Sequence, residues 1–517
     1  MDAMRLSDLV ASLGDCSIHG DASIDVSAIE FDSRLVRPGC LFVALRGGYT
    51  DGHQFLQRAR EAGAVTAVVE EIPDGSDAQY QAFVITPNSR ALLARLATRF
   101  YESPSMAMTV IGVTGTDGKT TTSHFIEAMG RFAGHMTGLI GTVAVRIGAD
   151  TDLHESRQTT PESLHIQRYL AEMRDHGVDL AVVEATSHGL ELHRLDGCEF
   201  DVGVVTNVTH EHLDFHGSVE NYRRAKGGLF RRVDAARLLG KCGIAIINAD
   251  DEGARSLIPD AGECRVILYS TQGDPDANVQ AVDIHSTPSG STFVLRTPDG
   301  AESVSIQLPG AYNVANAVAA AATGWALGIP LDIVAGGVSS LAAVSGRMET
   351  VDAGQPFAVI VDYAHSPDAI RSVLREARAL ASGRVLIVFG SAGERDIAKR
   401  AIQGAVAVTD ADFAVFTSED PRFEDPDAII AEIAEGAIGA GGRRGVDFDC
   451  IEDRRDAIQA VLERARAGDV VVLAGKGHER SIIYGAEKRP WNEPEVALDI
   501  LRGLGYQKHD TSGGSPR

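Results

Sequence analysis

The run Gly112–Ser123, written GVTGTDGKTTTS, combines three glycines, a lysine and several hydroxyl residues. Glycines let backbone N–H groups face phosphate oxygens, and a helix N-terminus adds favourable partial charge. In such a loop Lys119 would contact the terminal phosphates and Thr120 would be placed to ligate Mg²⁺. The spacing departs from GxxxxGKT because Val113 stands where the first glycine would be. The run predicts an ATP-binding loop, with a plain glycine-rich turn between strand and helix as the alternative.

A second polar run, Asn207–His216, holds three histidines and two acidic residues. This composition suggests zinc, but the HExxH pattern fails because Asp214 stands where its second histidine would be. Glu184 ends a separate expected strand and could join a metal site beside Thr120. A carboxylate, an imidazole and a phosphate-bound Mg²⁺ fit an ATP-dependent enzyme better than an isolated zinc. Histidines that cap a strand-to-helix loop are the structural alternative.

Short apolar strands that alternate with helices must position these runs. The expected strands are Met108–Val113, Leu180–Val183, Val202–Thr206, Phe357–Val361, Val385–Phe389, Phe413–Phe416 and Val470–Leu473. This rhythm predicts parallel sheets with crossover helices, where ligands bind beyond the carboxyl ends of the strands. Helix Thr120–Phe132 is expected to bury Phe125, Met129 and Phe132. A later helix, capped by Ser218, carries Lys226, which by periodicity alone is expected to be a solvated lysine.

Composition limits the class of protein. A chain of 517 residues is too long for one core and predicts two to four domains, with a linker at Tyr101–Ser105. The formal charge of −24 disfavours a nucleic-acid partner, because phosphate backbones are bound by basic surfaces. Six cysteines without a CxxC pair indicate reduced thiols. Without a signal-peptide pattern or a membrane-length apolar run, we expect a cytoplasmic protein. We also expect a monomer, and a disordered tail at Gln507–Arg517.

Nine motifs, taken in order, resemble the Mur ligases, ATP-dependent amide-forming enzymes of peptidoglycan synthesis. They are GVTGTDGKTTTS, TTPES (159–163), EATSHG (184–189), NVTHEHLDFHG (207–217), YRRAKGGLF (222–230), PGAYNVANA (309–317), GRMETV (346–351), VDYAHSPD (361–368) and AGKGHE (474–479). The resemblance covers nearly the whole chain and is strongest to the MurE type, the UDP-N-acetylmuramoyl-tripeptide synthetases.

The resemblance implies an α/β protein of three domains. These are a uridine-nucleotide-binding domain at 1–105, a central P-loop domain with a parallel sheet at 106–345, and a Rossmann-like amino-acid-binding domain at 346–517. It also implies small-molecule substrates only, with ATP and Mg²⁺ as cofactors.

The resemblance further implies roles for individual residues. For ATP, it implies Gly115, Thr116, Asp117, Gly118, Lys119, Thr120, Thr121, Asn313, Asn316, Arg347 and Asp362. For the UDP-MurNAc-dipeptide, it implies Phe31, Ser33, Gly48, Tyr49, Thr50, Thr159, Thr160, Thr186 and Arg194. For the incoming amino acid, it implies Arg395, Glu419, Asp420, Pro421, Arg422, Gly475 and Glu479. For Mg²⁺, it implies Thr120, Glu184, His212 and Lys226, the lysine as an N-carbamate, with Lys119, His212 and Lys226 taking part in catalysis.

The chain departs from the family pattern at three places. Asp117 replaces an asparagine beside the phosphates, and Leu192 replaces a polar substrate contact of a related enzyme type. Glu419-Asp420-Pro421-Arg422 replaces the Asp-Asn-Pro-Arg of members that add meso-diaminopimelate. The retained Arg422 favours a carboxylate on the added side chain, whereas Asp420 would favour the bare ammonium of lysine or ornithine.

We therefore expect a ligase that adds the third residue to UDP-MurNAc-L-Ala-D-Glu through an acyl phosphate, with meso-diaminopimelate favoured over lysine and ornithine. A folylpolyglutamate-type ligase is one alternative, disfavoured by the uridine-site match around Ser33. A P-loop switch GTPase is another, disfavoured because the chain has no NKxD guanine motif. An inactive scaffold is a third, and the presence of Lys119, Glu184, His212 and Lys226 argues against it.

Overall fold

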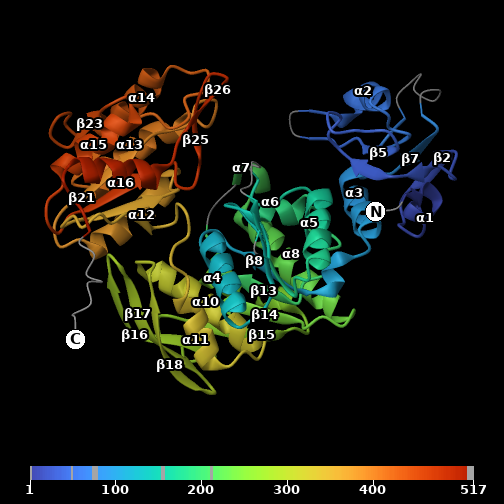
Figure 1. Ribbon diagram of the computed structural model, residues 1–517, viewed down its shortest axis with the longest axis horizontal. Helices are drawn as coiled ribbons and strands as arrows, with labels where there is room; N and C mark the ends of the chain where they lie inside the picture. The colour runs from blue at the N-terminus through green and yellow to red at the C-terminus, as the bar shows by residue number, and fades with distance from the viewer. Residues whose placement is uncertain are drawn as a thin grey trace, which may run out of the picture. The chain divides into compact units, whose positions relative to one another are not determined.

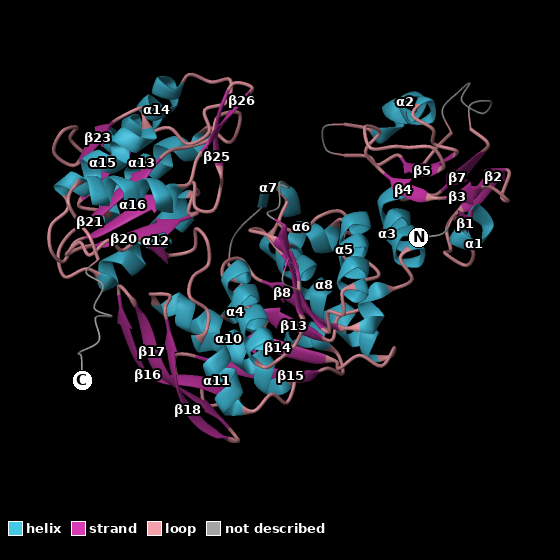
Figure 2. Ribbon diagram, in the orientation of Figure 1, coloured by secondary structure: helices cyan, strands magenta, loops and turns pink. Residues whose placement is uncertain are grey.

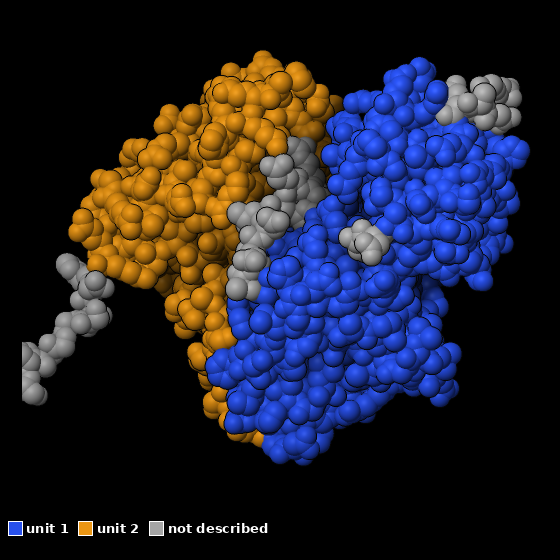
Figure 3. Space-filling view, turned by 45° about the vertical axis from the view of Figure 1, so that its right-hand side comes forward, with its two compact units in different colours: residues 1–280, 296–300, 316–338 blue, residues 281–295, 301–315, 339–517 orange. Residues whose placement is uncertain are grey.

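The computed structural model describes residues 3–47, 50–72, 80–148, 150–152, 158–209 and 213–508. The chain divides into two compact units (Figure 1, Figure 3). Unit 1 comprises 1–280, 296–300 and 316–338, and unit 2 comprises 281–295, 301–315 and 339–517. The expected tail lies outside the described residues from position 509 onward.

Unit 1 begins with a five-stranded sheet in the order β2-β7-β6-β5-β4. Its strands are β2 (Ser17–Gly20), β4 (Ala28–Glu30), β5 (Cys40–Val43), β6 (Thr66–Val69) and β7 (Ala82–Ile85), with β1 (Met4–Arg5) paired to β3 (Asp25–Val26) beside them. Helices α1 (Leu6–Val10), α2 (Leu56–Glu61) and α3 (Ser89–Phe100) complete this part. One apolar cluster joins α1, α3 and the sheet, and a second joins α2 and the sheet. Helix α3 ends at Phe100, where the linker was predicted.

The second sheet of unit 1 runs β11-β10-β9-β12-β8-β13-β14-β15 and on into β16. The strands are β8 (Thr109–Thr114), β9 (Thr137–Ile140), β10 (Val145–Ile147), β11 (Asp150–Asp152), β12 (Leu180–Glu184), β13 (Val202–Val205), β14 (Ile244–Asn248), β15 (Arg265–Ser270) and β16 (Val279–Thr287). From β9 to β16 all neighbouring strands pair in parallel.

Helices cover this sheet (Figure 2). They are α4 (Lys119–Phe132), α5 (Ser163–Asp175), α6 (Ser187–Glu191), α7 (Leu213–His216), α8 (Val219–Arg237) and α9 (Glu252–Arg255). The apolar faces of α5 and α8 join one core with the strands, whereas α4 contacts β8, β9 and β12. Strands β17 (Gly290–Thr297) and β18 (Gly300–Ile306) and helices α10 (Ala311–Ala326) and α11 (Leu331–Ser339) follow, and the division between the units passes through β16–β18 and α10.

Unit 2 contains a six-stranded sheet in the order β19-β20-β24-β21-β22-β23, parallel from β20 to β23. Its strands are β19 (Glu349–Thr350), β20 (Ala358–Asp362), β21 (Val385–Phe389), β22 (Phe413–Phe416), β23 (Phe448–Cys450) and β24 (Val470–Ala474), with a hairpin of β25 (Ser481–Tyr484) and β26 (Glu487–Pro490). The helices are α12 (Pro367–Leu380), α13 (Ala398–Asp410), α14 (Pro426–Gly439), α15 (Arg454–Arg464) and α16 (Glu493–Gly503). Two apolar clusters form, one with α12–α14 and one with α15 and α16.

The α/β class, the parallel sheets and all seven predicted strands are confirmed, each within about a residue at its ends. Phe125 and Met129 of α4 are buried as expected, but the prediction for Phe132 is wrong, because it lies at the last position of the helix and is exposed. Ser218 caps α8 by accepting a hydrogen bond from the Asn221 N–H, as predicted.

Candidate active site

The predicted phosphate-binding loop connects β8, which ends at Thr114, to α4, which begins at Lys119. Gly115 and Gly118 have φ of 150° and 83°, backbone conformations that favour glycine. A Cβ on Gly118 would also lie 2.3 Å from the Asn316 amide oxygen, and one on Gly115 would clash with Thr206. The Asp117 N–H donates to the Asn207 side chain over 2.9 Å. Neighbouring polar groups therefore hold the loop in shape while its glycines keep the backbone accessible.

Two lysines contact one carbonyl oxygen of this loop. Lys119 Nζ donates to the Gly115 oxygen over 2.9 Å and to the Thr116 oxygen over 2.7 Å. Lys226 Nζ donates to the same Gly115 oxygen over 2.6 Å and lies over the Tyr222 ring. The expectation of a solvated Lys226 is wrong: it is 1% exposed, because α8 turns it toward β8 and the loop. Two ammonium groups on one oxygen concentrate positive charge at the N-terminus of α4, which favours a polyanion.

Glu184, at the end of β12, lies beside the loop and is fully buried. Its Oε2 accepts from Thr120 Oγ1 over 3.0 Å and from Thr142 Oγ1 over 2.9 Å, and its Oε1 accepts from the Thr142 N–H. The structure thus brings Thr120 and Glu184 together, as the sequence predicted, through hard oxygen donors that suit Mg²⁺. The His124 Nδ1–H donates to the Thr120 carbonyl over 2.8 Å, and burial lowers the pKa of this imidazole. Thr142 and His124 were not predicted, because nothing in their local sequence marks them.

The metal-site prediction is only partly visible in the structure. His212 lies outside the described residues, and so do the neighbouring His210 and Glu211. Within the described ranges no group of three His, Cys, Asp or Glu side chains is placed to hold a metal ion. The ligand set with His212 and a modified Lys226 therefore stays a prediction.

The predicted muramoyl-peptide residues form one network near Glu184. Thr160 Oγ1 donates to the Glu184 carbonyl over 2.7 Å and lies 2.9 Å from Thr186 Oγ1. Thr159 Oγ1 lies 3.0 Å from Thr142 Oγ1. Arg194 Nη1 donates to the Thr160 carbonyl over 3.1 Å. Four predicted or newly found threonines and one arginine are thus gathered at the carboxyl ends of β12 and its neighbours.

Glu162, which was not predicted as a site residue, connects this network to the first domain. Its Oε1 lies 3.1 Å from Arg194 Nε and 2.5 Å from Arg90 Nη1 of α3. The Phe31 ring lies 5.2 Å from the His165 ring of α5. The TTPES match at 159–163 contains Glu162, so the signal was present in the sequence but not used.

The uridine-site predictions lie in the first domain. Ser33 is buried and Thr50 is exposed, the latter in a turn where the Gly47 N–H donates to the Thr50 carbonyl. Gly48 and Tyr49 lie outside the described residues. Leu192, which replaces a polar contact, is among the residues that line a cavity of about 380 Å³ together with Arg46 and Arg90.

The remaining ATP-site predictions fall in both units. In unit 1, buried Thr121 and Thr122 lie in the first turn of α4, and Thr122 Oγ1 donates to the Asn316 amide oxygen. In unit 2, the Asn313 amide donates to the Pro309 carbonyl over 2.7 Å. Arg347 lies over the Tyr363 ring, and Asp362 accepts the N–H groups of Met348 and Ala364 over 2.9 Å each.

The amino-acid predictions cluster at the carboxyl ends of β21, β22 and β24 in unit 2. Glu419 and Asp420 follow β22 and are each 6% exposed. Asp420 Oδ1 accepts from Lys476 Nζ over 2.9 Å, and Lys476 also donates to Glu479 Oε2 over 2.5 Å. Arg422, at φ 55°, donates its N–H to the Ile483 carbonyl, whereas Arg395 is exposed. Gly475 has φ 100° and Pro421 is buried.

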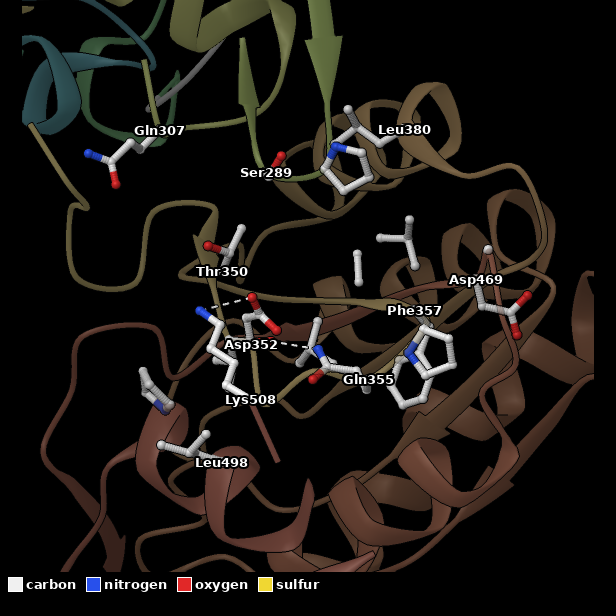
Figure 4. A pocket seen from close by; sticks show the side chains of 18 of the residues that line it. Ser289, Gln307, Thr350, Asp352, Gln355, Phe357, Leu380, Asp469, Leu498 and Lys508 are labelled. Atoms are coloured by element: carbon white, nitrogen blue, oxygen red, sulfur yellow. Dashed lines mark hydrogen bonds and ion pairs between the residues drawn. The ribbon is translucent and has the colours of Figure 1, made fainter. Parts of the chain in front are cut away.

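A cavity of about 910 Å³ lies at the opposite end of the same sheet (Figure 4). Phe357 and Asp469, just before β20 and β24, line it with Asp352 and Lys508, whose ion pair measures 3.0 Å. It contains none of the predicted site residues. In the described part of the chain, no helix is long and apolar enough to cross a membrane.

Comparison with known proteins decides the family. Three family models match in order: "Mur ligase family, catalytic domain" at 25–101, "Mur ligase middle domain" at 113–324, and "Mur ligase, glutamate ligase domain" at 346–477. The UDP-N-acetylmuramyl-tripeptide synthetase of Roseiflexus is 45% identical over 97% of this chain and 100% of that protein. The chain belongs to the Mur ligase family. It is an ATP-dependent ligase of three-domain architecture, as the sequence predicted.

Further relatives and solved structures agree with this membership. A ligase of Bacillus cereus, named for UDP-N-acetylmuramoyl-L-alanyl-D-glutamate and 2,6-diaminopimelate, is 39% identical over 97% of this Mur ligase and 99% of that protein. A solved structure with the same name superposes with a TM-score of 0.67 at 28% identity over 98% of this chain and 100% of that chain. A Mycobacterium tuberculosis folylpolyglutamate synthase complexed with ADP shares only the fold, at 18% identity, TM-score 0.59, 83% of this chain and 95% of that one.

Proposed function

We propose that this Mur ligase adds the third amino acid, meso-diaminopimelate, to UDP-N-acetylmuramoyl-L-alanyl-D-glutamate in peptidoglycan synthesis. Relatives with this named activity align over almost the whole chain. The observation that carries the chemical part is the pair of lysine ammonium groups on the Gly115 carbonyl at the start of α4. Such a cluster of charge favours a bound triphosphate.

The chain's own residues account for the first step. Loop N–H groups and the α4 N-terminus would bind the ATP phosphates. The Lys119 ammonium would stabilise the negative charge on the γ-phosphoryl group as this group moves to the substrate carboxylate. The product of that step is an acyl phosphate, which the incoming amine attacks to form the amide while phosphate leaves. Arg194 and Thr160 would orient the peptide near Glu184.

We propose that Thr120 and Glu184, with His212 and carbamylated Lys226, hold Mg²⁺. Bound Mg²⁺ would neutralise phosphate charge during transfer. The oxygen donors of Thr120 and Glu184 fit this ion, and Lys226 lies next to the loop without solvent around it. As an ammonium, Lys226 repels Lys119 across their shared oxygen; as a carbamate it would attract both Lys119 and a cation.

The amino-acid choice rests on Arg422. Its Nε finds no hydrogen-bond partner in the described part of the chain, and the Glu394 carboxylate lies 3.9 Å from its Nη1. A carboxylate on the added side chain would supply a charge-assisted, bidentate partner for this guanidinium. Lysine and ornithine, which lack that carboxylate, stay the alternatives. A cytoplasmic location and a monomeric state stay expectations.

The test is ADP release by the purified full chain with UDP-MurNAc-L-Ala-D-Glu, ATP and Mg²⁺, followed by mass analysis of the product. We expect release that depends on both the dipeptide and an amino acid, and a tripeptide containing diaminopimelate when diaminopimelate, lysine and ornithine compete. Turnover that needs no muramoyl dipeptide, or that uses a folate with glutamate instead, would contradict the proposal.

A further inference from the structure

The two carboxylates after β22 have different surroundings. Glu419 and Asp420 are neighbours in sequence and equally buried, yet every interaction that neutralises Asp420 comes from distant parts of unit 2. Its Oδ1 accepts from Lys476 Nζ, which follows β24, over 2.9 Å, and from the Ile483 N–H of β25 over 3.0 Å. Lys476 is fully buried. Asp420 is therefore a paired, structural carboxylate.

Glu419 is left with unmet hydrogen-bonding capacity. Its Oε2 has no hydrogen-bond partner among the described residues, and neither has the Nε of Arg422. A Cβ on Gly475 would lie 2.8 Å from that oxygen, so glycine keeps the space beside it clear. Buried polar atoms are nearly always paired, so an orphan carboxylate oxygen and an orphan guanidinium nitrogen near one strand end point to a ligand with complementary charges.

Lys476 connects these two observations. It binds Asp420 and Glu479 at once, so it removes the charge of Asp420 from the amino-acid site and leaves Glu419 and Arg422 as the groups with unmet capacity. Without that lysine, Glu419, Asp420 and Glu479 would present three carboxylates beside the Arg422 guanidinium, a balance that suits an ammonium without a carboxylate.

We propose that Lys476 is a positioning residue that sets the choice of the third amino acid by neutralising Asp420. Glu419 and Arg422 are then the anion and the cation left with unpaired atoms, and they match a side chain carrying both an ammonium and a carboxylate. This inference rests on the proposed function and deepens it: the substrate is a diamino dicarboxylic acid because of the Asp420–Lys476 pair, and in spite of the acidic residue that replaces asparagine.

The experiment compares kcat/KM for meso-diaminopimelate and for L-lysine in the wild type, Asp420→Asn, Lys476→Met and the double variant. In Asp420→Asn the amide still accepts from Ile483, and we expect the diaminopimelate-to-lysine ratio to change by less than about threefold. In Lys476→Met the Asp420 carboxylate loses its ammonium partner, and we expect the diaminopimelate-to-lysine ratio of kcat/KM to fall on the order of tenfold or more. The double variant should return toward the wild-type ratio.

A structural role for Lys476 alone would lower both activities and leave the ratio unchanged, which would overturn the inference. A tenfold or larger gain in the ratio in Asp420→Asn would overturn it too, because Asp420 would then face the substrate ammonium. If Lys476→Met does not fold, the ratio measured in Asp420→Asn tests the inference by itself. A wild type that uses neither amino acid contradicts the proposed ligase activity, whereas a wild type that prefers lysine keeps that activity and overturns both the diaminopimelate assignment and the present inference.

Discussion

The phosphate loop of unit 1 and the strand ends around β22 of unit 2 are both rich in buried polar groups, but they satisfy them differently. Around the loop, Glu184 accepts three hydrogen bonds, and both Lys119 and Lys226 have carbonyl partners. Around β22, Glu419 Oε2 and Arg422 Nε lack partners within the described part of the chain. The charged groups of the first region are paired within its own network; the second has charged groups with unpaired atoms that a ligand would complete.

This difference separates general chemistry from selectivity. A preorganised cluster of charge lowers the barrier of phosphoryl transfer regardless of which amino acid follows. Unpaired groups discriminate, because a ligand that fails to satisfy them leaves a buried polar group without a partner. The comparison predicts that changes near the loop reduce turnover for every amino acid, and that changes near β22 alter which one is used.

The largest effect is expected for Lys119→Ala. The variant lacks the ammonium that stabilises negative charge on the transferring phosphoryl group, so kcat should fall by on the order of a hundredfold or more for every amino acid. Steady-state ADP release with circular dichroism as a folding check measures this. Lys488→Ala, on exposed β26, is the matched control and should keep wild-type turnover. Near-normal turnover by a folded Lys119→Ala would remove the phosphate-loop assignment.

Lys226→Ala tests the same region at a second residue. If Lys226 acts as a carbamate, the variant should lose activity by about a hundredfold, and small carboxylic acids added to the assay should restore part of it by supplying an anion. Lys226→Arg, which keeps a cation but cannot be carbamylated, should be equally inactive, and it should not be rescued because the arginine side chain fills the space that the acid would occupy. Intact mass measured under CO₂-containing buffer gives a readout independent of turnover. An active enzyme whose Lys226 stays unmodified would contradict the carbamate.

A stability effect of intermediate size is expected at Arg454, which lies behind the β22 region. Arg454 is 1% exposed and pairs with fully buried Glu493, while its guanidinium also donates to the carbonyls of Ser418 and Ala474 at the ends of β22 and β24. Arg454→Met leaves Glu493 buried without its partner and should lower the free energy of unfolding by about 3–5 kcal/mol. Urea denaturation measures this.

The control for Arg454 is the double variant Arg454→Met/Glu493→Gln, which removes both charges. It should recover a part of the lost stability, because the cost in the single variant arises mainly from the uncompensated carboxylate. A single variant as stable as the wild type would show that the pair does not hold the strand ends.

The sequence predicted the loop region better than the β22 region for a physical reason. Gly115, Gly118, Lys119 and Thr120 act within one turn of chain, so spacing alone carries their geometry. Asp420 and Lys476 are separated by 56 positions, and their pairing depends on how β22 and β24 are placed in the sheet. Local patterns therefore left open whether Asp420 faces a ligand or an interior lysine.

The burial of individual helix side chains was also predicted incompletely from local sequence patterns. The helical period of α8 does not reveal that Lys226 points at the loop, because that depends on how α8 packs against β8. Family resemblance singled out Lys226 where periodicity did not. Conversely, Phe132 was expected in the core from its spacing, but helix α4 ends there and leaves its ring exposed.

The smallest effect, and the sharpest test of the β22 region, is the pH dependence of amino-acid binding. Burial raises the pKa of Glu419 to about 7, an effect that Lys476, Lys399 and Arg454 oppose and that Glu479 reinforces. A substrate ammonium binds the charged carboxylate. Between pH 6 and pH 8 the charged fraction of a group with this pKa rises about tenfold, so KM for the amino acid should fall by about tenfold as pH rises.

Glu419→Gln gives the control for this titration. It should raise KM for the amino acid and flatten its pH profile, while KM for ATP keeps the wild-type profile. The sign for stability is opposite to that for binding: the folded, ligand-free enzyme holds the Glu419 proton more tightly than the unfolded chain, so its free energy of unfolding should decline as pH rises from about 4.5 through 7. Glu419→Gln should remove that decline. A variant with the wild-type KM profile would show that Glu419 does not bind the ammonium, and that the unpaired oxygen serves another ligand group.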